Sequence, residues 1–194
     1  MSGADLDRKL VAAVERLGRA IGAARRQAAT TLGLSQLGLQ IVELLADGRP
    51  RRIGRLAAEL DITQPTASEA VATLVDRGLV LRQRDPDDGR AVAMRLSTAG
   101  EELADDVRTR LAPVLRAEPG TDDAADRGVA LRVLLTEIAR LQRDGVISVS
   151  RNCLTCRHFD PGDPTTTPRC RLLDRDLPNA DLRVDCPEHA PVAT

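Results

Sequence analysis

The chain has 194 residues, of which 42% are apolar and one is aromatic, and its formal net charge at pH 7 is −1. This length suits one domain with an appendage or two small domains, and the apolar fraction excludes disorder as the default state. The near-neutral charge excludes DNA binding by bulk charge alone, so a basic surface depends on where the arginines lie. Phe159 is the sole aromatic residue, so the core has to be aliphatic, which favours helices over strands.

The N-terminal residues are charged and helical in pattern, and they lack the apolar segment of a signal peptide. No stretch approaches the roughly eighteen apolar residues of a membrane-spanning helix. We therefore expect a cytoplasmic protein without a membrane partner. In that compartment, clustered cysteines indicate metal binding or redox chemistry ahead of structural disulfides.

Three helices are predicted in the first third of the chain. Over residues 5–29, apolar side chains recur every three or four positions, which indicates a long amphipathic helix. Ser35 is placed to cap a second helix, which should end near Gly48 and Pro50. A short third helix is predicted over residues 53–60.

A fourth helix is predicted over residues 63–78. Thr63 is a suitable N-cap, and Pro65 falls in the first turn, where a missing N–H costs little. Gly78 should end this helix. A short antiparallel hairpin should follow, because residues 79–85 and 91–97 alternate apolar and polar side chains around a turn-rich sequence.

Two long helices complete the predicted helical part. Ser97 is placed to cap the first of them, and a loop is expected at residues 118–123. The last helix should run to about Arg143 and end at Gly145.

The order of helix, helix, recognition-type helix and hairpin is that of a winged helix-turn-helix. In this motif the start of the second helix of the pair lies nearest the base edges of the major groove. Gln64, Pro65, Thr66 and Ser68 are therefore predicted to contact DNA. Gln64 is suited to adenine, and the Thr66 methyl is suited to thymine. The alternative is that these residues serve only the helix start and its capping.

The hairpin supplies the wing of the predicted DNA surface. Arg90 lies at its tip, where minor-groove or phosphate contact is favoured over simple solvation, and Asp88 is placed to hold the Arg90 guanidinium. Arg82 and Arg84 lie on one strand face, where they could contact phosphate or solvate the sheet. An arginine corner at residues 51–55 could also touch phosphate or merely be exposed.

The stretch from 34 to 103 resembles the MarR family of bacterial regulators. The resemblance lies in the steps Gly78-Leu79-Val80, Asp88-Gly89-Arg90 and Leu96-Ser97-Thr98-Ala99-Gly100. Two positions depart from the family pattern, since Gly89 stands where arginine is frequent and Ser97 where threonine is usual. The resemblance extends over roughly the first 143 residues and implies a homodimer that reads a pseudo-palindromic operator on double-stranded DNA.

All four cysteines fall in the last 42 residues, with two, thirteen and fifteen residues between successive members: Cys153, Cys156, Cys170 and Cys186. The first pair has the spacing of a metal knuckle, whereas the other two cysteines are single. Zinc is favoured over an iron–sulfur cluster, and a metal-free thiol switch is the third alternative. His158 and His189 could replace a cysteine as ligand, but a position outside the ligand set is favoured for both.

These patterns predict a mainly α-helical protein in three parts. Residues 1–144 should form the DNA-binding and dimerisation domain, 145–152 a linker, and 153–194 a metal-binding module with too few apolar residues for a core of its own. We expect a DNA-binding transcription regulator, a repressor rather than an activator, whose cysteine module stabilises or gates it. A small-molecule effector is compatible with this prediction. The competing hypothesis is a redox or metal-dependent enzyme or sensor that uses the winged helix to bind proteins, but no catalytic motif supports it.

Overall fold

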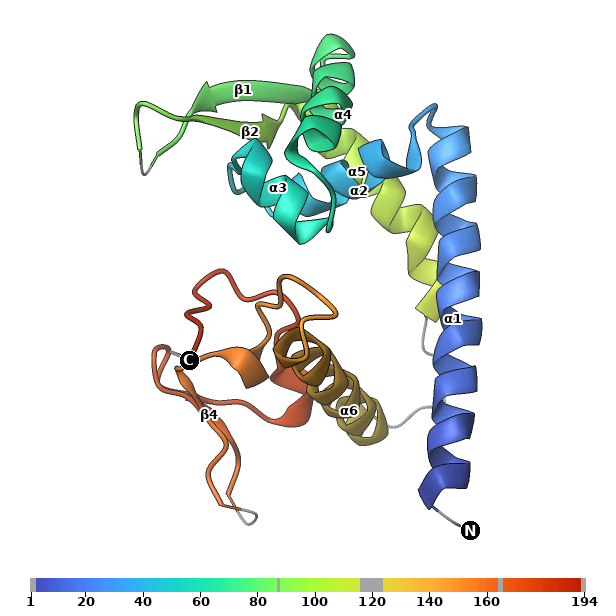
Figure 1. The fold of residues 1–194 in the computed structure, drawn as a ribbon, viewed down its shortest axis with the longest axis vertical. Helices are drawn as coiled ribbons and strands as arrows, with labels where there is room; N and C mark the ends of the chain where they lie inside the picture. The colour runs from blue at the N-terminus through green and yellow to red at the C-terminus, as the bar shows by residue number, and fades with distance from the viewer. Residues whose placement is uncertain (1–2, 87, 116–123, 164–165, 193–194) are drawn as a thin grey trace. The chain divides into compact units, whose positions relative to one another are not determined.

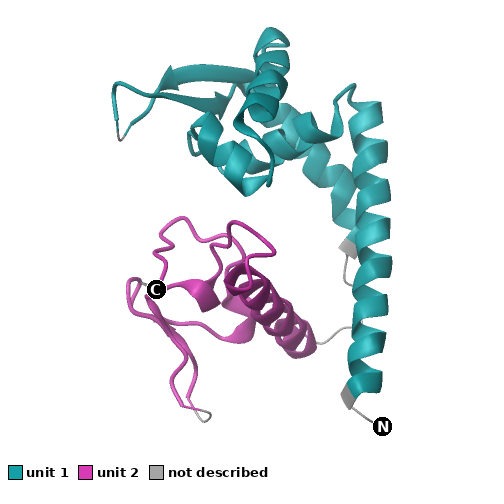
Figure 2. Cartoon of the chain, in the orientation of Figure 1, with its two compact units in different colours: residues 1–116 teal, residues 117–194 magenta. Residues whose placement is uncertain are grey.

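The computed structural model describes residues 3–86, 88–115, 124–163 and 166–192. The chain divides into two compact units, Met1–Arg116 and Ala117–Thr194 (Figure 2). The loop expected at 118–123 lies outside the described residues.

The first unit contains the helices that the apolar periodicity predicted. They are α1 (Gly3–Thr31), α2 (Gln36–Leu45), α3 (Ile53–Glu59), α4 (Gln64–Asp76) and α5 (Thr98–Leu111) (Figure 1). A short 3-10 turn, η1 (Ala112–Leu115), follows α5. The prediction of a mainly α-helical fold is confirmed.

Side-chain caps fix where three of these helices begin. The Ser35 hydroxyl accepts a hydrogen bond from the Gly38 N–H at 2.9 Å, and the Thr63 hydroxyl accepts one from the Thr66 N–H at 3.3 Å. Ser97 caps α5 in the same way. Each cap satisfies a backbone donor that the first helical turn leaves open, so local sequence determines these boundaries.

The predicted hairpin is also present, as β1 (Val80–Arg84) and β2 (Val92–Leu96). The strands pair antiparallel, and Figure 1 shows the hairpin extending away from the helices of its unit. Arg51 adds a short third edge, because its backbone N–H donates to the Met94 carbonyl at 2.9 Å and its carbonyl accepts from the Met94 N–H at 2.7 Å. The base of the wing is therefore tied to the segment that leads into α3.

An aliphatic core joins α1, α2, α4, α5 and the hairpin. Side chains from α2, α3, α4 and the hairpin are fully or almost fully buried, among them Leu39, Ile41, Val42, Leu45, Leu56, Val71, Leu74, Val80 and Met94. Because α4 and the hairpin share one core, the recognition helix and the wing are held by the same packing.

The first half of α1 leaves a row of apolar side chains in solvent, each 46–59% exposed: Leu6, Leu10, Val11, Val14 and Leu17. In the described part of the chain, no single helix has the length and apolar character needed to cross a membrane. One bent pair, Ala4–Thr31 with Gln36–Leu45, meets the requirement only when the two helices are taken together across a 96° bend.

The second unit is one helix followed by short irregular elements. The helix is α6 (Ala124–Arg143), and the remaining segment forms two 3-10 turns and a three-stranded antiparallel sheet. These elements are η2 (Cys153–Thr155), β3 (Phe159–Asp160), β4 (Arg169–Cys170), β5 (Arg175–Asp176) and η3 (Asn179–Asp181). After α6, few of the described residues of this unit therefore lie in regular, backbone-paired structure.

The cysteine segment packs on α6, which the sequence had assigned to the DNA-binding domain. Leu135 of α6 forms a buried cluster with Cys153, Leu177 and Leu182. Gly128 permits close approach, since a Cβ there would lie 3.1 Å from the Ala180 nitrogen. The segment does have few buried apolar side chains of its own, and α6 supplies the apolar face that completes its core. The boundary between compact units accordingly falls at 116 rather than 144.

Candidate nucleic-acid interface and cysteine cluster

The start of α4 presents the predicted reading residues to solvent. Gln64, Pro65, Thr66 and Ser68 are all exposed, whereas Ala67 between them is fully buried. The Thr66 hydroxyl lies 2.8 Å from the Thr63 hydroxyl, so it takes part in the cap while remaining accessible. The helix is thus anchored by its apolar side and offers its polar first turn outward.

A hollow of about 840 Å³ lies between α3, α4 and the hairpin. It brings together two residues of the reading helix, Gln64 and Ser68, and one of the wing, Arg82. Arg52 and Arg55 line the same hollow from the start of α3. The hollow therefore joins three of the predicted DNA-contacting residues, and four arginines line it: Arg51, Arg52, Arg55 and Arg82.

Arg52 connects the start of α3 to the turn of the wing. Its Nε donates to Asp85 Oδ2 at 2.6 Å, and its Nη2 lies 3.3 Å from Asp88 Oδ2. The hydrogen bond to Asp85 raises the pKa of the Arg52 guanidinium. Asp85 was not identified from the sequence as a partner of Arg52. The one feature that could have suggested it is its position as an acidic residue directly after the first strand of the hairpin.

The wing tip differs in one contact from the expectation. Asp88 was expected to hold the Arg90 guanidinium, but its Oδ1 accepts from the Arg90 backbone N–H at 3.2 Å and its other oxygen faces Arg52. The carboxylate therefore shapes the turn. Arg90 is exposed, as are Arg82 and Arg84, which lie two residues apart and so on the same face of β1.

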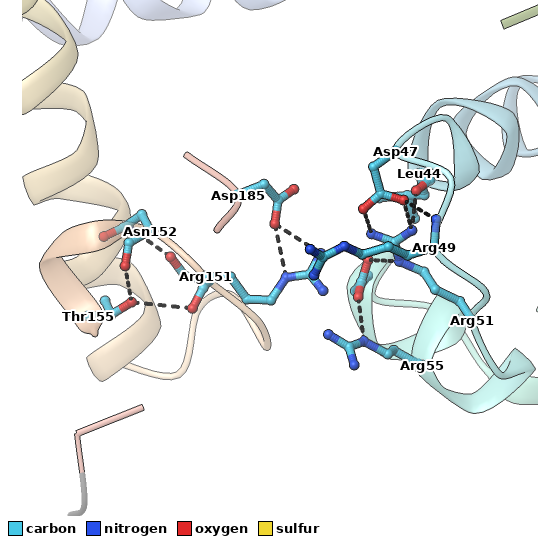
Figure 3. A network of polar contacts seen from close by, with 11 residues as sticks. Leu44, Asp47, Arg49, Arg51, Arg55, Arg151, Asn152, Thr155 and Asp185 are labelled. Carbon is cyan, nitrogen blue, oxygen red and sulfur yellow. Dashed lines mark hydrogen bonds and ion pairs between the residues drawn. The ribbon is translucent and has the colours of Figure 1, made fainter. Parts of the chain in front are cut away.

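Arg51 belongs to the interior rather than to the DNA surface. Its side chain is 5% exposed, and its Nη1 and Nη2 donate to the two Asp47 carboxylate oxygens at 2.7 and 2.8 Å. Nη1 also donates to the Leu44 carbonyl, as Figure 3 shows, and Nε lies 3.4 Å from Glu59 Oε2. Neither alternative for the arginine corner, phosphate contact or simple exposure, therefore describes Arg51.

The second unit brings the four cysteines toward one another through its backbone. Cys153 donates its N–H to the Arg183 carbonyl at 3.1 Å, and Cys186 donates to the Arg151 carbonyl at 2.9 Å. Cys170 pairs with Phe159, whose N–H in turn donates to the Cys156 carbonyl at 3.0 Å. Segments separated by up to 34 residues meet here, and all four thiols are free.

Arg183 donates to two of the sulfur atoms. Its backbone N–H lies 3.2 Å from Cys153 Sγ, and its Nη1 lies 3.8 Å from Cys186 Sγ. Burial raises the pKa of the Cys153 thiol, the Arg183 N–H lowers it, and the charges of the other three thiols raise it again. Among the residues that the structure describes, however, no three His, Cys, Asp or Glu side chains already surround a common metal position.

The His189 side chain contacts a hydroxyl group of the η2 turn. Its Nε2 lies 2.9 Å from the Thr155 hydroxyl, and burial lowers the pKa of the imidazole. The neutral ring is therefore favoured, with Thr155 beside it.

Together the helix pair, the exposed start of α4 and the projecting hairpin define a winged helix-turn-helix protein. Residues 32–91, which hold the helix-turn-helix and part of the wing, match the sequence model of the MarR family. Solved structures show that the chain has the winged-helix fold of MarR regulators.

Three similar solved structures illustrate the match. BldR, a transcriptional regulator from Sulfolobus solfataricus, is 23% identical with a TM-score of 0.55, covering 72% of this chain and 99% of its own. CouR from Rhodococcus jostii RHA1, bound to p-coumaroyl-CoA, is 25% identical with a TM-score of 0.51, covering 66% and 86%. A MarR family regulator from Listeria monocytogenes complexed with 26mer DNA is 14% identical with a TM-score of 0.59, covering 69% and 89%. No curated protein matches the chain significantly.

Proposed function

We propose that this protein is a sequence-specific DNA-binding transcription regulator of the cytoplasm, acting as a homodimeric repressor on a pseudo-palindromic operator. The observation that carries the proposal is the hollow in which Gln64 and Ser68 of α4 meet Arg82 of the wing. An amide and a hydroxyl at a helix start suit base edges, and guanidinium groups around them suit phosphate.

The comparisons support a regulator rather than an enzyme. The family model covers the predicted DNA-reading segment, and a protein with the same fold is complexed with DNA. A small-molecule effector is part of the proposal, because CouR is bound to p-coumaroyl-CoA. The competing redox enzyme or sensor would need catalysis or electron transfer at the cysteines without a DNA site, so operator binding by the purified protein separates the two functions.

Replacing Gln64 by Ala should relax discrimination at one base-pair position by about 1–3 kcal/mol, because a bidentate amide contact would be lost. Replacing Arg90 by Ala should instead weaken binding to all sequences and reduce the salt dependence, because a phosphate contact carries no base information. Titrations of the protein's own promoter DNA and its single-base variants, at several salt concentrations, measure both effects.

Gln40→Ala is a matched control for this experiment, since it removes the same amide from an exposed position on α2. It should change neither affinity nor base preference. If Gln64→Ala behaved like the control, the start of α4 would not be the reading element.

The exposed apolar row on α1 suits a second copy of the chain. Leu10 and Val14 lie one turn apart and are 48% and 51% exposed, and burial of such side chains between symmetric helices is a common basis of dimers. Leu10→Glu should therefore shift the protein from twice its 20.9 kDa chain mass toward the monomer.

Light scattering coupled to gel filtration measures that mass. Ala12→Glu adds the same charge about half a turn round the helix from Leu10, and it should leave the dimer intact. Equal dissociation of both variants would point to charge rather than to the apolar row, and a monomeric wild-type protein would contradict the dimer.

A further inference from the structure

The cysteine segment lacks the usual means of holding a fold. Its strands are two residues long, and the buried apolar side chains that it contributes are Cys153, Leu177 and Leu182. A segment of this size with so little to bury ordinarily needs disulfides or a metal ion. All four of its cysteines are free thiols, so disulfides do not fill that role in this structure.

The backbone contacts of the segment converge on the thiols. Cys153 and Cys156 are joined by the η2 turn, in which the Cys156 N–H donates to the Cys153 carbonyl at 3.1 Å. Cys170 is brought beside this turn by its pairing with Phe159. Cys186 is held by its hydrogen bond to the Arg151 carbonyl, and the Arg151 Nε donates to Asp185 at 2.9 Å (Figure 3).

We propose that Cys153, Cys156, Cys170 and Cys186 form a four-thiolate zinc site that stabilises the second unit. Zinc suits four sulfur ligands from irregular backbone, because it has no geometric preference beyond tetrahedral packing of its ligands. Binding is an exchange without redox change: four S–H groups release their protons to solvent and four S–Zn bonds form. The site is independent of DNA binding, so it can fail its test while the regulator proposal stands.

Arg183 is the positioning residue of this site. It already directs its backbone N–H at Cys153 Sγ and its guanidinium at Cys186 Sγ, as donors around metal-bound sulfur atoms do. Four thiolates and one Zn²⁺ leave a net charge of −2, which the Arg183 cation partly offsets. Such outer contacts are typical of thiolate metal sites.

The thiols have to turn to complete the site, because no three His, Cys, Asp or Glu side chains of the described residues yet surround a common metal position. The Cys186 thiol now donates to Glu188 Oε2 at 3.5 Å, and it has to turn from that carboxylate toward the other sulfurs. A zinc-bound thiolate has no proton to donate to Glu188, and the Arg183 Nη1 lies 3.1 Å from that carboxylate and can pair with it instead. Such changes are rotations about side-chain torsions and leave the backbone contacts of the segment in place.

Zinc would stabilise more than the cysteine segment. Cys153 is 6% exposed and packs in the same buried cluster as Leu135 of α6. Loss of the metal should therefore loosen the cysteine segment where it packs on α6 and expose the apolar face of that helix. The expected result is local unfolding of the second unit while the winged helix stays folded.

The test uses the full chain, purified without oxygen, with zinc, iron and sulfide measured together. We expect one zinc per chain, no visible absorption band, and a tail that resists limited proteolysis until a chelator is added. Cobalt substituted for zinc should give the spectrum of a tetrahedral thiolate site. Cys156→Ser should lower zinc content and open the tail to protease while the helical first unit remains resistant.

Thr167→Ala is the matched control, because it removes a hydroxyl from an exposed position in the same segment without touching a thiol. It should keep both zinc and protease resistance. Iron with sulfide in place of zinc, or a metal-free chain whose tail is equally resistant, would overturn the proposal. Zinc retained in full by Cys156→Ser would overturn the four-thiolate ligand set.

Discussion

Arg51→Met should lower the free energy of unfolding of the first unit by about 3–5 kcal/mol. The substitution keeps the length of the side chain but removes the cation that faces two carboxylates. Glu59, whose side chain is 6% exposed, would then be a buried charge that has lost its interior cation, and the Leu44 carbonyl would lose a donor. Chemical denaturation monitored by circular dichroism measures the loss.

Arg55→Met provides the matched control. Arg55 donates to the same Glu59 carboxylate at 3.0 Å, but its side chain is 57% exposed. The Arg55 end of this ion pair is solvated, and Arg51 would still face Glu59 in the variant, so it should lose clearly less than Arg51→Met, about 1 kcal/mol. If the two variants lost equal stability, burial of Arg51 would not be the cause of its importance.

The ion pair between Arg51 and Asp47 predicts that the stability of the fold depends on pH. Burial acts to raise the pKa of Asp47, but hydrogen bonds from Arg51 and from the Arg49 N–H outweigh it, and the pKa lies below its ordinary value of 3.8. A carboxylate with a lowered pKa stabilises the fold above its unfolded pKa, and this contribution is lost as the pH falls through the folded pKa. Wild-type stability should therefore fall in acid below about pH 4, and Arg51→Met should lack this part of the decline.

Arg51 also marks the limit of what the sequence could predict. Helix starts at Ser35, Thr63 and Ser97 were predictable because a cap involves residues three apart, and the helices and hairpin follow local periodicity. The partners of Arg51 come from the end of α2 and the turn after it, from α3 and from β2, and no local pattern distinguishes this arginine from the exposed Arg55.

The candidate sites also have parts that local sequence predicts and parts that depend on contacts between distant residues. The exposure of Gln64 and Ser68 follows from the positions of these residues around α4, and the apolar periodicity of the sequence predicts those positions. The contact between Arg52 and Asp85 joins residues 33 apart, and it depends on how the hairpin folds back toward α3. The sequence also could not predict that α6 packs with the cysteine segment. By composition, the apolar face of α6 that contains Leu135 suits a dimer interface and a covering segment equally well.

Gly100→Ala should destabilise the first unit by about 3 kcal/mol, because the glycine allows α5 to lie directly against Leu79, the residue before β1. A Cβ at this position would lie 2.1 Å from the Leu79 carbonyl oxygen and 3.2 Å from the Leu96 Cβ. That carbonyl has little freedom to move, since it accepts from the Ser97 N–H at 3.0 Å, while the Ser97 hydroxyl donates to the Gly78 carbonyl at 2.6 Å. This close approach gives a physical reason for the glycine in the motif that resembles MarR regulators.

The glycine at position 18 offers the opposite case within the same fold. A Cβ on Gly18 would meet nothing within 4 Å, and the residue lies inside α1, where alanine is the better helix former. Gly18→Ala should therefore raise stability by about 0.5–1 kcal/mol. Thermal unfolding of both variants beside the wild type measures the two effects. Equal stability of Gly100→Ala and wild type would mean that α5 can shift away from Leu79 at no cost, and the close approach would not explain the glycine.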